Sequence, residues 1–235
     1  SLWDLLKDAV SNDLKSKKQR LAVRDSKKLY SAQKGLKPLE ESVLSFLWLQ
    51  DLKINSFCQL LSSLSACNIK AIADYPWYAN KDYPLPLTTN NSAILNYADL
   101  LKCAMDKQGV RFCYAGSCVV TVGEFNDRVR SLGNKSIVLF NSCAKLISRL
   151  RNNFKGDINL IVDKQGGRNS YSGLLKNRLS VTDIKVLKES NKISTYVVAD
   201  AERKMEVSFV EKGEDTSMAT ALASMFSKYV RELFM

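Results

Sequence analysis

Two acidic segments follow strand-like apolar runs, and their side chains could hold a hard divalent cation. The run Ile158–Val162 ends on Asp163, which precedes a Gly-Gly-Arg-Asn turn. The run Val207–Val210 leads to Glu214 and Asp215, directly before an amphipathic helical pattern. Carboxylates at strand ends occupy the place where α/β folds hold their chemistry. The pattern predicts a metal site, although a structural interpretation stays open in which Asp163 opens a turn and Asp215 caps a helix.

The residue types that the chain lacks narrow the chemistry. There is no histidine, which excludes a Ser-His-Asp triad, a Cys-His dyad and histidine-ligated zinc within this chain. Acid, base and metal-binding roles therefore fall to carboxylates. The six cysteines form no Cys-x-x-Cys pair, and most of them have apolar neighbours. We therefore expect reduced, buried thiols in a cytosolic protein.

Composition and charge indicate the class of partner. The 235 residues carry 35 Lys and Arg against 24 Asp and Glu, a formal charge of +11. This balance favours a polyanion such as nucleic acid, with a generally basic protein as the alternative. The 46% hydrophobic content can fill a sizeable core. No signal peptide is visible, and no apolar run approaches the roughly 20 residues that a bilayer requires. We expect a cytoplasmic protein with no membrane partner.

Hydrophobic periodicity predicts an α/β fold that positions the acids. The last helix should have its N-terminal cap at Thr216 or Ser217. The predicted helices cover 39–52, 92–107, 124–131 and 137–151, and a further helix begins in 168–175. The predicted strands are a hairpin in 110–122, the run ending at 163, and an antiparallel pair at 193–199 and 205–211. We predict one domain over 1–235, with an insertion at about 70–125 that is irregular and rich in aromatics and prolines over 72–87.

Three blocks resemble, in the same order, motifs of ribonuclease HII, a member of the ribonuclease H-like nucleases. The first, Asp25-Ser-Lys-Lys-Leu29, is similar to the Asp-Ser-Lys-Lys-Leu block of that family. The second, Leu160-Ile-Val-Asp163, resembles the family's central strand, which ends in an active-site Asp. The third is Lys212-Gly-Glu-Asp215 with the helix that follows it, which continues through Ala221-Leu-Ala-Ser-Met-Phe-Ser-Lys228 to Arg231-Glu232. It resembles the family's Lys-Gly-Asp (or Lys-Ala-Asp), Ser-Ala-Ala-Ser-Ile-x-Ala-Lys and Arg-Asp.

The chain also departs from the family pattern. The family opens with a strand that carries an adjacent Asp-Glu pair and a Gly-Arg-Gly loop, and this chain contains no Asp-Glu dipeptide. That strand would precede Ser1, so about half of the family's ligand set is present. Glu214 stands at the position of the family's last Asp, with Asp215 beside it, so either residue could be the ligand. The segments Gly166-Gly-Arg-Asn169 and Ala221-Leu-Ala-Ser-Met225 resemble a divergent bacterial branch of the family.

The resemblance implies a ribonuclease H-like mixed sheet flanked by helices, with Asp163 near its centre, and metal-dependent chemistry. In-line hydrolysis of a phosphodiester can use two divalent ions about 4 Å apart, held by clustered carboxylates. Asp163, with Glu214 or Asp215, would bind Mg²⁺ or Mn²⁺ and serve as the catalytic set.

The resemblance, and proximity to the acids, also suggest which cations meet the nucleic acid. They are Lys27, Lys28, Arg168 and Lys212, with ordinary surface charge as the alternative for each. Asn169 and Tyr171 are further polar candidates.

The sequence leads to three functional hypotheses. The first is a ribonuclease HII-like endonuclease that hydrolyses RNA in RNA/DNA duplexes, although the segment 1–235 itself could be inactive. The second is a nucleic-acid-binding module on the same fold without catalysis. The third is another ribonuclease H-like nuclease that acts on DNA. Fold alone does not separate these hypotheses.

Overall fold

The structure is a computed structural model, and it describes residues 1–13, 19–30, 35–65, 72, 75, 78, 81–181, 183–199 and 203–235. These residues form two compact units. Unit 1 consists of Ser1–Ser65, Ile72–Ser117 and Glu214–Met235, and the described part of unit 2 is Cys118–Gly213. The two units are therefore described one at a time.

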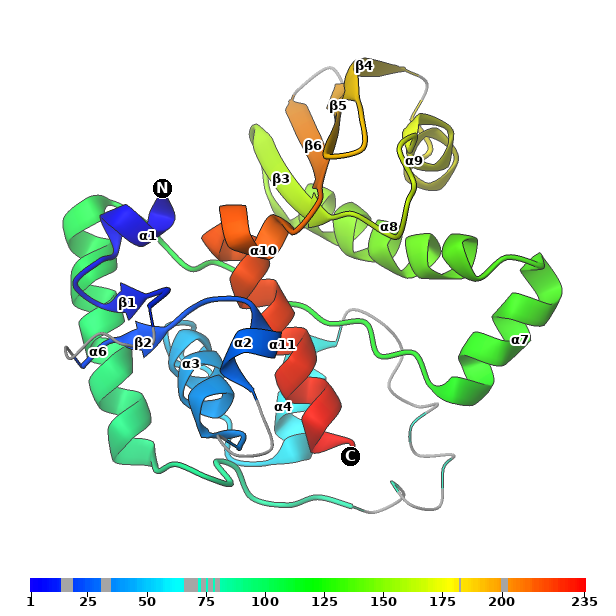
Figure 1. The fold of residues 1–235 in the computed structure, drawn as a ribbon. Coiled ribbons are helices and arrows are strands. Elements are labelled where there is room, and N and C mark those ends of the chain that lie inside the picture. The colour runs from blue at the N-terminus through cyan, green and yellow to red at the C-terminus, as the bar shows by residue number, and fades with distance from the viewer. Residues whose placement is uncertain are drawn as a thin grey trace. The chain divides into compact units, whose positions relative to one another are not determined.

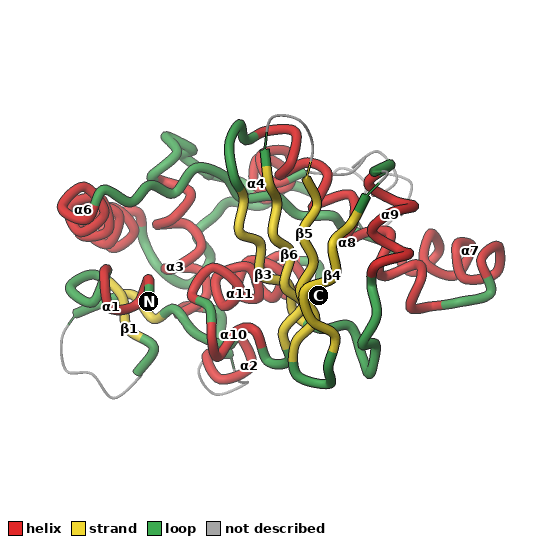
Figure 2. The backbone as a smooth tube through the Cα atoms, turned by 90° about the horizontal axis from the view of Figure 1, so that it is seen from above, coloured by secondary structure: helices red, strands yellow, loops and turns green. Residues whose placement is uncertain are grey.

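Unit 2 is built on a mixed four-stranded sheet in the order β3-β6-β5-β4 (Figures 1 and 2). Strand β3 (Ile158–Asp163) runs parallel to β6 (Lys204–Val210), and β6 is antiparallel to β5 (Ile193–Ala199). Strand β5 is also antiparallel to β4 (Ile184–Glu189). The predicted strand before Asp163 and the predicted antiparallel pair are confirmed. The polar stretch 200–203, which the sequence indicates as the turn between these two strands, lies largely outside the described residues.

The predicted central position of Asp163 is wrong, because β3 is an edge strand of this sheet. Its side chains alternate between half-buried and exposed positions, and Ile161 retains 36% of its accessible surface. The resemblance to the family's central strand suggested the centre, and an apolar run of this length is also typical of a strand that is buried on both faces. Here only the side with Ile158, Leu160 and Val162 packs on the core.

Two helices supply most of the core on that side of the sheet. They are α8 (Lys135–Asn153) and α9 (Ser172–Leu179), and α7 (Val122–Leu132) precedes them. Phe140 and Ile147 from α8 meet Leu175 from α9 in one buried cluster with β5 and β6. Asn134 caps α8 by accepting hydrogen bonds from the Ser136 and Ile137 N–H groups. The helices predicted at 124–131 and 137–151 are confirmed.

One predicted element, the hairpin in 110–122, differs in the structure. The segment 110–121 contains no strand, and the Ser117 N–H donates instead to the Leu64 carbonyl (2.6 Å). Its alternating pattern therefore does not lead to a hairpin, because its backbone finds a partner at the end of a helix. The helix predicted to begin in 168–175 is confirmed, and it starts at Ser172, after Arg168 and Asn169.

Unit 1 is mainly helical. It contains α1 (Leu2–Leu5), α2 (Ser26–Leu29), α3 (Lys37–Trp48), α4 (Phe57–Leu64), α6 (Asn91–Gln108) and α11 (Met218–Leu233), with the short parallel pair β1 (Val10–Ser11) and β2 (Leu21–Ala22). Helix α11 buries its apolar stripe, including Met225, Tyr229 and Leu233, and Ser217 is its N-cap. The helices predicted at 39–52 and 92–107 and the predicted cap are confirmed. Helix α10 (Gly213–Thr216) is the point where the chain passes from unit 2 to unit 1.

The cysteines do not form the expected set of reduced, buried thiols. Cys58, Cys103 and Cys113 are exposed, and Cys118 takes part in a disulfide bond. Among the described cysteines, Cys143 is the one that is largely enclosed, and burial raises the pKa of its thiol to about 11. Apolar neighbours in the sequence do not reveal which face of a helix a cysteine occupies. In the described residues, no helix is both long enough and apolar enough to span a membrane.

Candidate metal and nucleic-acid site

Asp163 lies at the exposed C-terminal end of β3, and one of its two carboxylate oxygens accepts a hydrogen bond. The parallel register pairs it with Val210, and the Lys164 N–H donates to the Val210 carbonyl (3.0 Å). Lys212 then adopts a left-handed conformation (φ 53°), and the following N–H, from Gly213, donates to Asp163 Oδ1 (3.1 Å). No other hydrogen bond or ion pair of Asp163 occurs within the described residues. One carboxylate oxygen therefore remains for a ligand.

The two acids of the third block have different surroundings. Asp215 Oδ1 lies 2.6 Å from Lys28 Nζ, and both side chains are nearly half exposed. Glu214 is half-buried and makes no hydrogen bond or ion pair with any described residue. Helix α11 is capped by Ser217, so Asp215 does not have the capping role of the structural interpretation. Between the two acids, Glu214 is the one whose oxygens are left for a metal.

The first motif block forms the short helix α2, with three residues turned inward and two outward. Asp25 is its N-cap and accepts a hydrogen bond from the Lys27 N–H (3.0 Å). Asp25, Ser26 and Leu29 are buried, whereas Lys27 and Lys28 are exposed. The block therefore combines three buried residues, which stabilise the fold, with two cations on the surface.

The first and third motif blocks come together in unit 1. Ser26 Oγ on α2 lies 2.8 Å from Ser224 Oγ on α11, although 198 residues separate them in the sequence. The Lys28–Asp215 pair links the same two blocks. Two segments that resemble one family are thus packed on each other.

A third contact between these blocks involves a residue that the sequence did not single out. Lys228 Nζ lies 4.4 Å from the ring centre of Tyr30 and 2.7 Å from Glu232 Oε1. A hydrogen bond between Tyr30 and Glu232 raises the pKa of the tyrosine, and the Lys228 hydrogen bond is the main cause that lowers the pKa of Glu232. The signal for Tyr30 was its position directly after Asp25-Ser-Lys-Lys-Leu29.

The turn after β3 is held by its own polar groups. Arg168 donates to Ser136 Oγ at the start of α8, and its guanidinium carbon lies 5.9 Å from the ring centre of Tyr171. Asn169 accepts from Lys164 Nζ (3.0 Å) and donates to Asn191 (2.7 Å). Tyr171 is fully buried and stacks on Phe209 at 3.7 Å. Tyr171 is therefore a core residue and cannot contact a nucleic acid. Arg168 already donates one hydrogen bond within the fold.

The described residues contain no group of three or more Asp, Glu or Cys side chains placed to hold one metal ion. Asp163 and Glu214 still provide oxygen donors of the type that Mg²⁺ prefers. Asp163 belongs to unit 2, and Glu214 and Asp215 belong to unit 1. Lys212 lies in unit 2 beside Gly213, and its exposed side chain makes no interaction with another described residue. Among the seven predicted site residues, the described contacts bring together Lys28 and Asp215, which form an ion pair.

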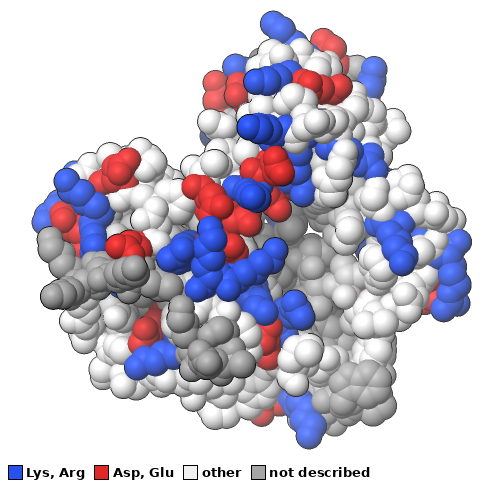
Figure 3. All heavy atoms as spheres, in the orientation of Figure 1, with Lys and Arg blue, Asp and Glu red and all other residues white. Residues whose placement is uncertain are grey.

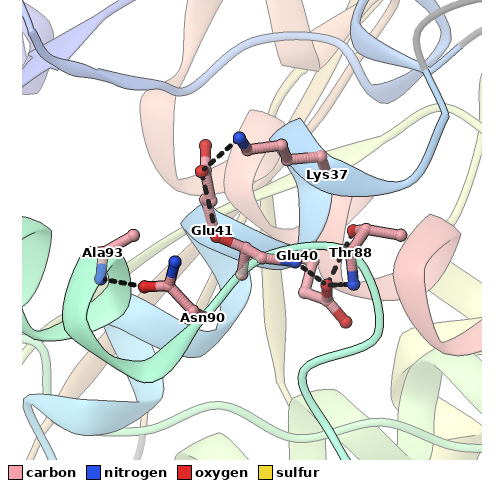
Figure 4. Close-up of polar contacts among 7 residues, drawn as sticks. Lys37, Glu40, Glu41, Thr88, Asn90 and Ala93 are labelled. Carbon is pink, nitrogen blue, oxygen red and sulfur yellow. Dashed lines mark hydrogen bonds and ion pairs between the residues drawn. The ribbon is translucent and has the colours of Figure 1, made fainter.

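Sequence reasoning missed a buried carboxylate, Glu40 on α3 (Figure 4). Its oxygens accept hydrogen bonds from the backbone N–H groups of Leu87 (2.7 Å), Thr88 (2.6 Å) and Thr89 (3.2 Å). The hydroxyl groups of Thr88 (2.7 Å) and Tyr229 (2.8 Å) complete the set. A signal was present, because Glu40 shares the apolar face of α3 with Val43, Leu44 and Leu47.

No protein-family model, no curated protein and no solved structure matches this chain. The functional argument therefore depends on the residues themselves and on their contacts.

Proposed function

We propose that the chain is a ribonuclease HII-like, metal-dependent endonuclease that hydrolyses RNA in RNA/DNA duplexes in the cytoplasm. The observation that carries the proposal is the packing of α2 on α11, which joins the blocks that begin at Asp25 and Lys212. The contacts Ser26–Ser224 and Lys28–Asp215 connect residues far apart in the sequence. Contact between independently chosen motif blocks is expected of a common site, and not of chance matches.

The available oxygens suggest roles for the acids. Asp163 would be a metal ligand through the carboxylate oxygen that Gly213 does not occupy. Glu214, the next residue after Gly213, would be the second ligand. Bound Mg²⁺ or Mn²⁺ would supply an activated water and stabilise the departing oxygen. Asp215 would instead hold Lys28, which fixes the position of a phosphate-binding cation.

The basic residues have the chemistry to hold a backbone. Lys27 and Lys212 are exposed and can approach phosphate oxygens without breaking a contact within the described chain. Lys28 remains nearly half exposed beside Asp215, whereas Arg168 would first have to turn away from Ser136. We also assign the mixed sheet to the ribonuclease H-like class, supported by the position of Asp163 at the end of a strand with a parallel neighbour.

A second candidate is a nucleic-acid-binding module without catalysis. The lack of a three-carboxylate group among the described residues favours it, as does the use of Asp215 by Lys28. Such a module would bind duplexes with a steep salt dependence and would not respond to Mg²⁺.

The test is cleavage of a labelled duplex that contains one ribonucleotide, with Mg²⁺ or Mn²⁺. We expect metal-dependent cutting beside the ribonucleotide, and a loss of at least about a hundredfold in Asp163→Asn, because a direct ligand should matter at least as much as an outer-shell partner. Asp183→Asn is the matched control, since Asp183 is also an exposed acid of unit 2. Binding without cutting would favour the module, and cutting of an all-DNA duplex would favour the DNA nuclease.

A further inference from the structure

Helices α7, α8 and α9 of unit 2 surround an open groove of about 800 Å³ with a basic lining. Its cations are Arg128 from α7, Lys145 and Arg149 from α8, and Arg178 from α9. Most of the remaining lining is Ser and Asn side chains, and none of the lining residues is acidic or aromatic. Lys and Arg side chains are visible over α7 in Figure 3. None of these residues belongs to the site described above.

The amphipathic pattern of α8 produces one wall of the groove. Phe140 and Ile147 face the buried core of unit 2. Asn141, Lys145 and Arg149 recur every fourth residue and line the groove. The polar stripe continues to Asn152, so it extends about 16 Å along the helix at about 1.5 Å for each residue.

Two of the groove cations, Lys145 and Arg178, differ from the arginines that hold the fold together. Arg151 donates to the Leu179 carbonyl, and Arg203 donates to the carbonyls of Arg151 and Phe154. Those two guanidinium groups join α8 to its surroundings. By contrast, Lys145 and Arg178 make no hydrogen bond or ion pair with any residue that the structure describes, and both are exposed. Their charge is therefore left for a ligand.

The groove also presents neutral hydrogen-bonding groups. The side-chain oxygen of Asn141 (Oδ1) is buried and has no hydrogen-bond partner among the described residues. Rotating that amide by half a turn would present its NH₂ group, and the two orientations are nearly indistinguishable in shape. Arg128 is ion-paired with Glu124, which lies outside the lining. The other cations stand beside hydroxyl and amide groups with no acid in the lining, which suits phosphate oxygens, because these only accept hydrogen bonds.

We propose that this groove binds the phosphate backbone of a nucleic-acid duplex. The proposal deepens the function proposed above, on which it rests for the class of partner. At about 3.4 Å of axial rise for each phosphate of one strand, the α8 stripe matches about five phosphates. Single-stranded nucleic acid is usually held by bases stacked on aromatic rings. The lining contains no such ring, which favours a duplex recognised by its backbone.

The double variant Lys145→Gln/Arg178→Gln tests the proposal in the full 235-residue chain. The control is Lys185→Gln/Lys188→Gln, which removes two exposed cations from β4 of the same unit. Fluorescence anisotropy of a short labelled RNA/DNA duplex, over a salt series, gives the affinity and its salt dependence. If both cations contact phosphates, the slope of log K against log salt should become shallower by about 1.8. Affinity at about 0.1 M salt should fall by about tenfold or more, and the control should retain most of its affinity.

Each outcome decides the proposal. If the wild type binds and the two double variants bind alike, the groove assignment is wrong and the proposed function stands. If the wild type binds no duplex even at low salt, the nucleic-acid partner is wrong and both proposals fail. Inorganic phosphate, added at constant ionic strength, tests for a small-anion site. If the groove variant loses affinity for inorganic phosphate but keeps the duplex affinity of the wild type, the groove holds single phosphate groups and the backbone assignment is overturned. Melting temperatures close to the wild type should show that both variants fold.

Discussion

Glu40 lies on a helix and Asp163 lies at the end of a strand, and their two carboxylates have opposite surroundings. Glu40 is fully buried in unit 1 and accepts hydrogen bonds from five donors. Asp163 is exposed in unit 2 and accepts one hydrogen bond, from Gly213. A carboxylate whose oxygens are saturated by the protein can only organise the fold. One that is left half satisfied at the surface can still bind a ligand.

The donors explain how Glu40 tolerates burial. A buried charge is costly unless it is paired or hydrogen-bonded. No Lys or Arg contacts Glu40 in the described structure, and three successive backbone N–H groups, from residues 87–89, take that role. The same carboxylate accepts from Tyr229, which joins α3 to α11. The helix that carries the third motif block is therefore anchored by an acid that is not part of the predicted site.

The largest effect should come from Glu40→Ala. The substitution leaves several buried donors without an acceptor, which should lower the free energy of unfolding by about 3 to 5 kcal/mol. Glu41→Ala is the neighbouring control, because Glu41 accepts a hydrogen bond from the Thr89 hydroxyl and forms a 3.8 Å ion pair with Lys37 from a more exposed position. It should cost about 1 kcal/mol or less. Urea unfolding measures both, and equal losses would contradict the comparison.

Glu214→Gln should have the next largest effect, on catalysis and not on folding. If Glu214 is the metal ligand, metal-dependent cleavage should fall by about a hundredfold or more, or about 2.7 kcal/mol in the activation free energy. Asp215→Asn should lose less activity, because its carboxylate is already occupied by Lys28. The Mg²⁺ dependence of the cleavage rate measures both variants. A greater loss in Asp215→Asn would reverse their assigned roles.

Tyr229→Phe removes one of the five donors and leaves Glu40 in place. A hydrogen bond to a charged group contributes about 1.5 to 3 kcal/mol, so the free energy of unfolding should fall by about 2 kcal/mol. Tyr83→Phe is a useful reference, since the Tyr83 hydroxyl donates to a main-chain carbonyl, that of Leu233. Its loss in urea unfolding should be smaller. A larger loss of unfolding free energy in Tyr83→Phe would mean that the hydrogen bond from Tyr229 to Glu40 contributes less to stability than a hydrogen bond to a main-chain carbonyl.

Alkaline pH should reveal the corresponding tyrosine–glutamate contact in unit 2. Burial, and then the hydrogen bond to Glu189, raise the pKa of Tyr196 from 10.0 to about 12. Because the folded pKa is raised, this contribution to stability is complete below pH 10 and is lost as the pH rises toward about 12. Tyrosinate absorbance and urea unfolding at increasing pH measure it. Glu189→Gln should lower the pKa of Tyr196, and an unchanged titration would rule out the contact.

The sequence predicted the elements better than their partners. Strand β3, the antiparallel pair β5–β6 and the Ser217 cap follow from local patterns, because periodicity and capping depend on near neighbours. The edge position of β3 depends on which strands pair, which a local pattern does not contain. The Val110–Val122 hairpin failed for the same reason.

The candidate site shows the same division. The acids at Asp163 and Glu214 were predicted from residue type and position. The pairing of Lys28 with Asp215 spans 187 residues, and it could be known only from the packing of α2 on α11. Glu40 was overlooked because its backbone donors lie 47 to 49 residues away, at the end of a segment read as irregular and just beyond it. Long-range hydrogen bonds thus decided which carboxylates are structural and which are available.

The smallest effect should come from the exposed Lys28–Asp215 pair. Both side chains are nearly half exposed, so their attraction is weakened by water and salt. A double-mutant cycle with Lys28→Ala and Asp215→Ala should give a coupling of about 0.2 to 1 kcal/mol, which decreases as salt is added. A coupling of that size means that Lys28 can leave Asp215 for a phosphate at little cost. A salt-independent coupling of several kcal/mol would instead make the pair a structural contact like that of Glu40, and would remove Lys28 from the cations that can hold a nucleic acid.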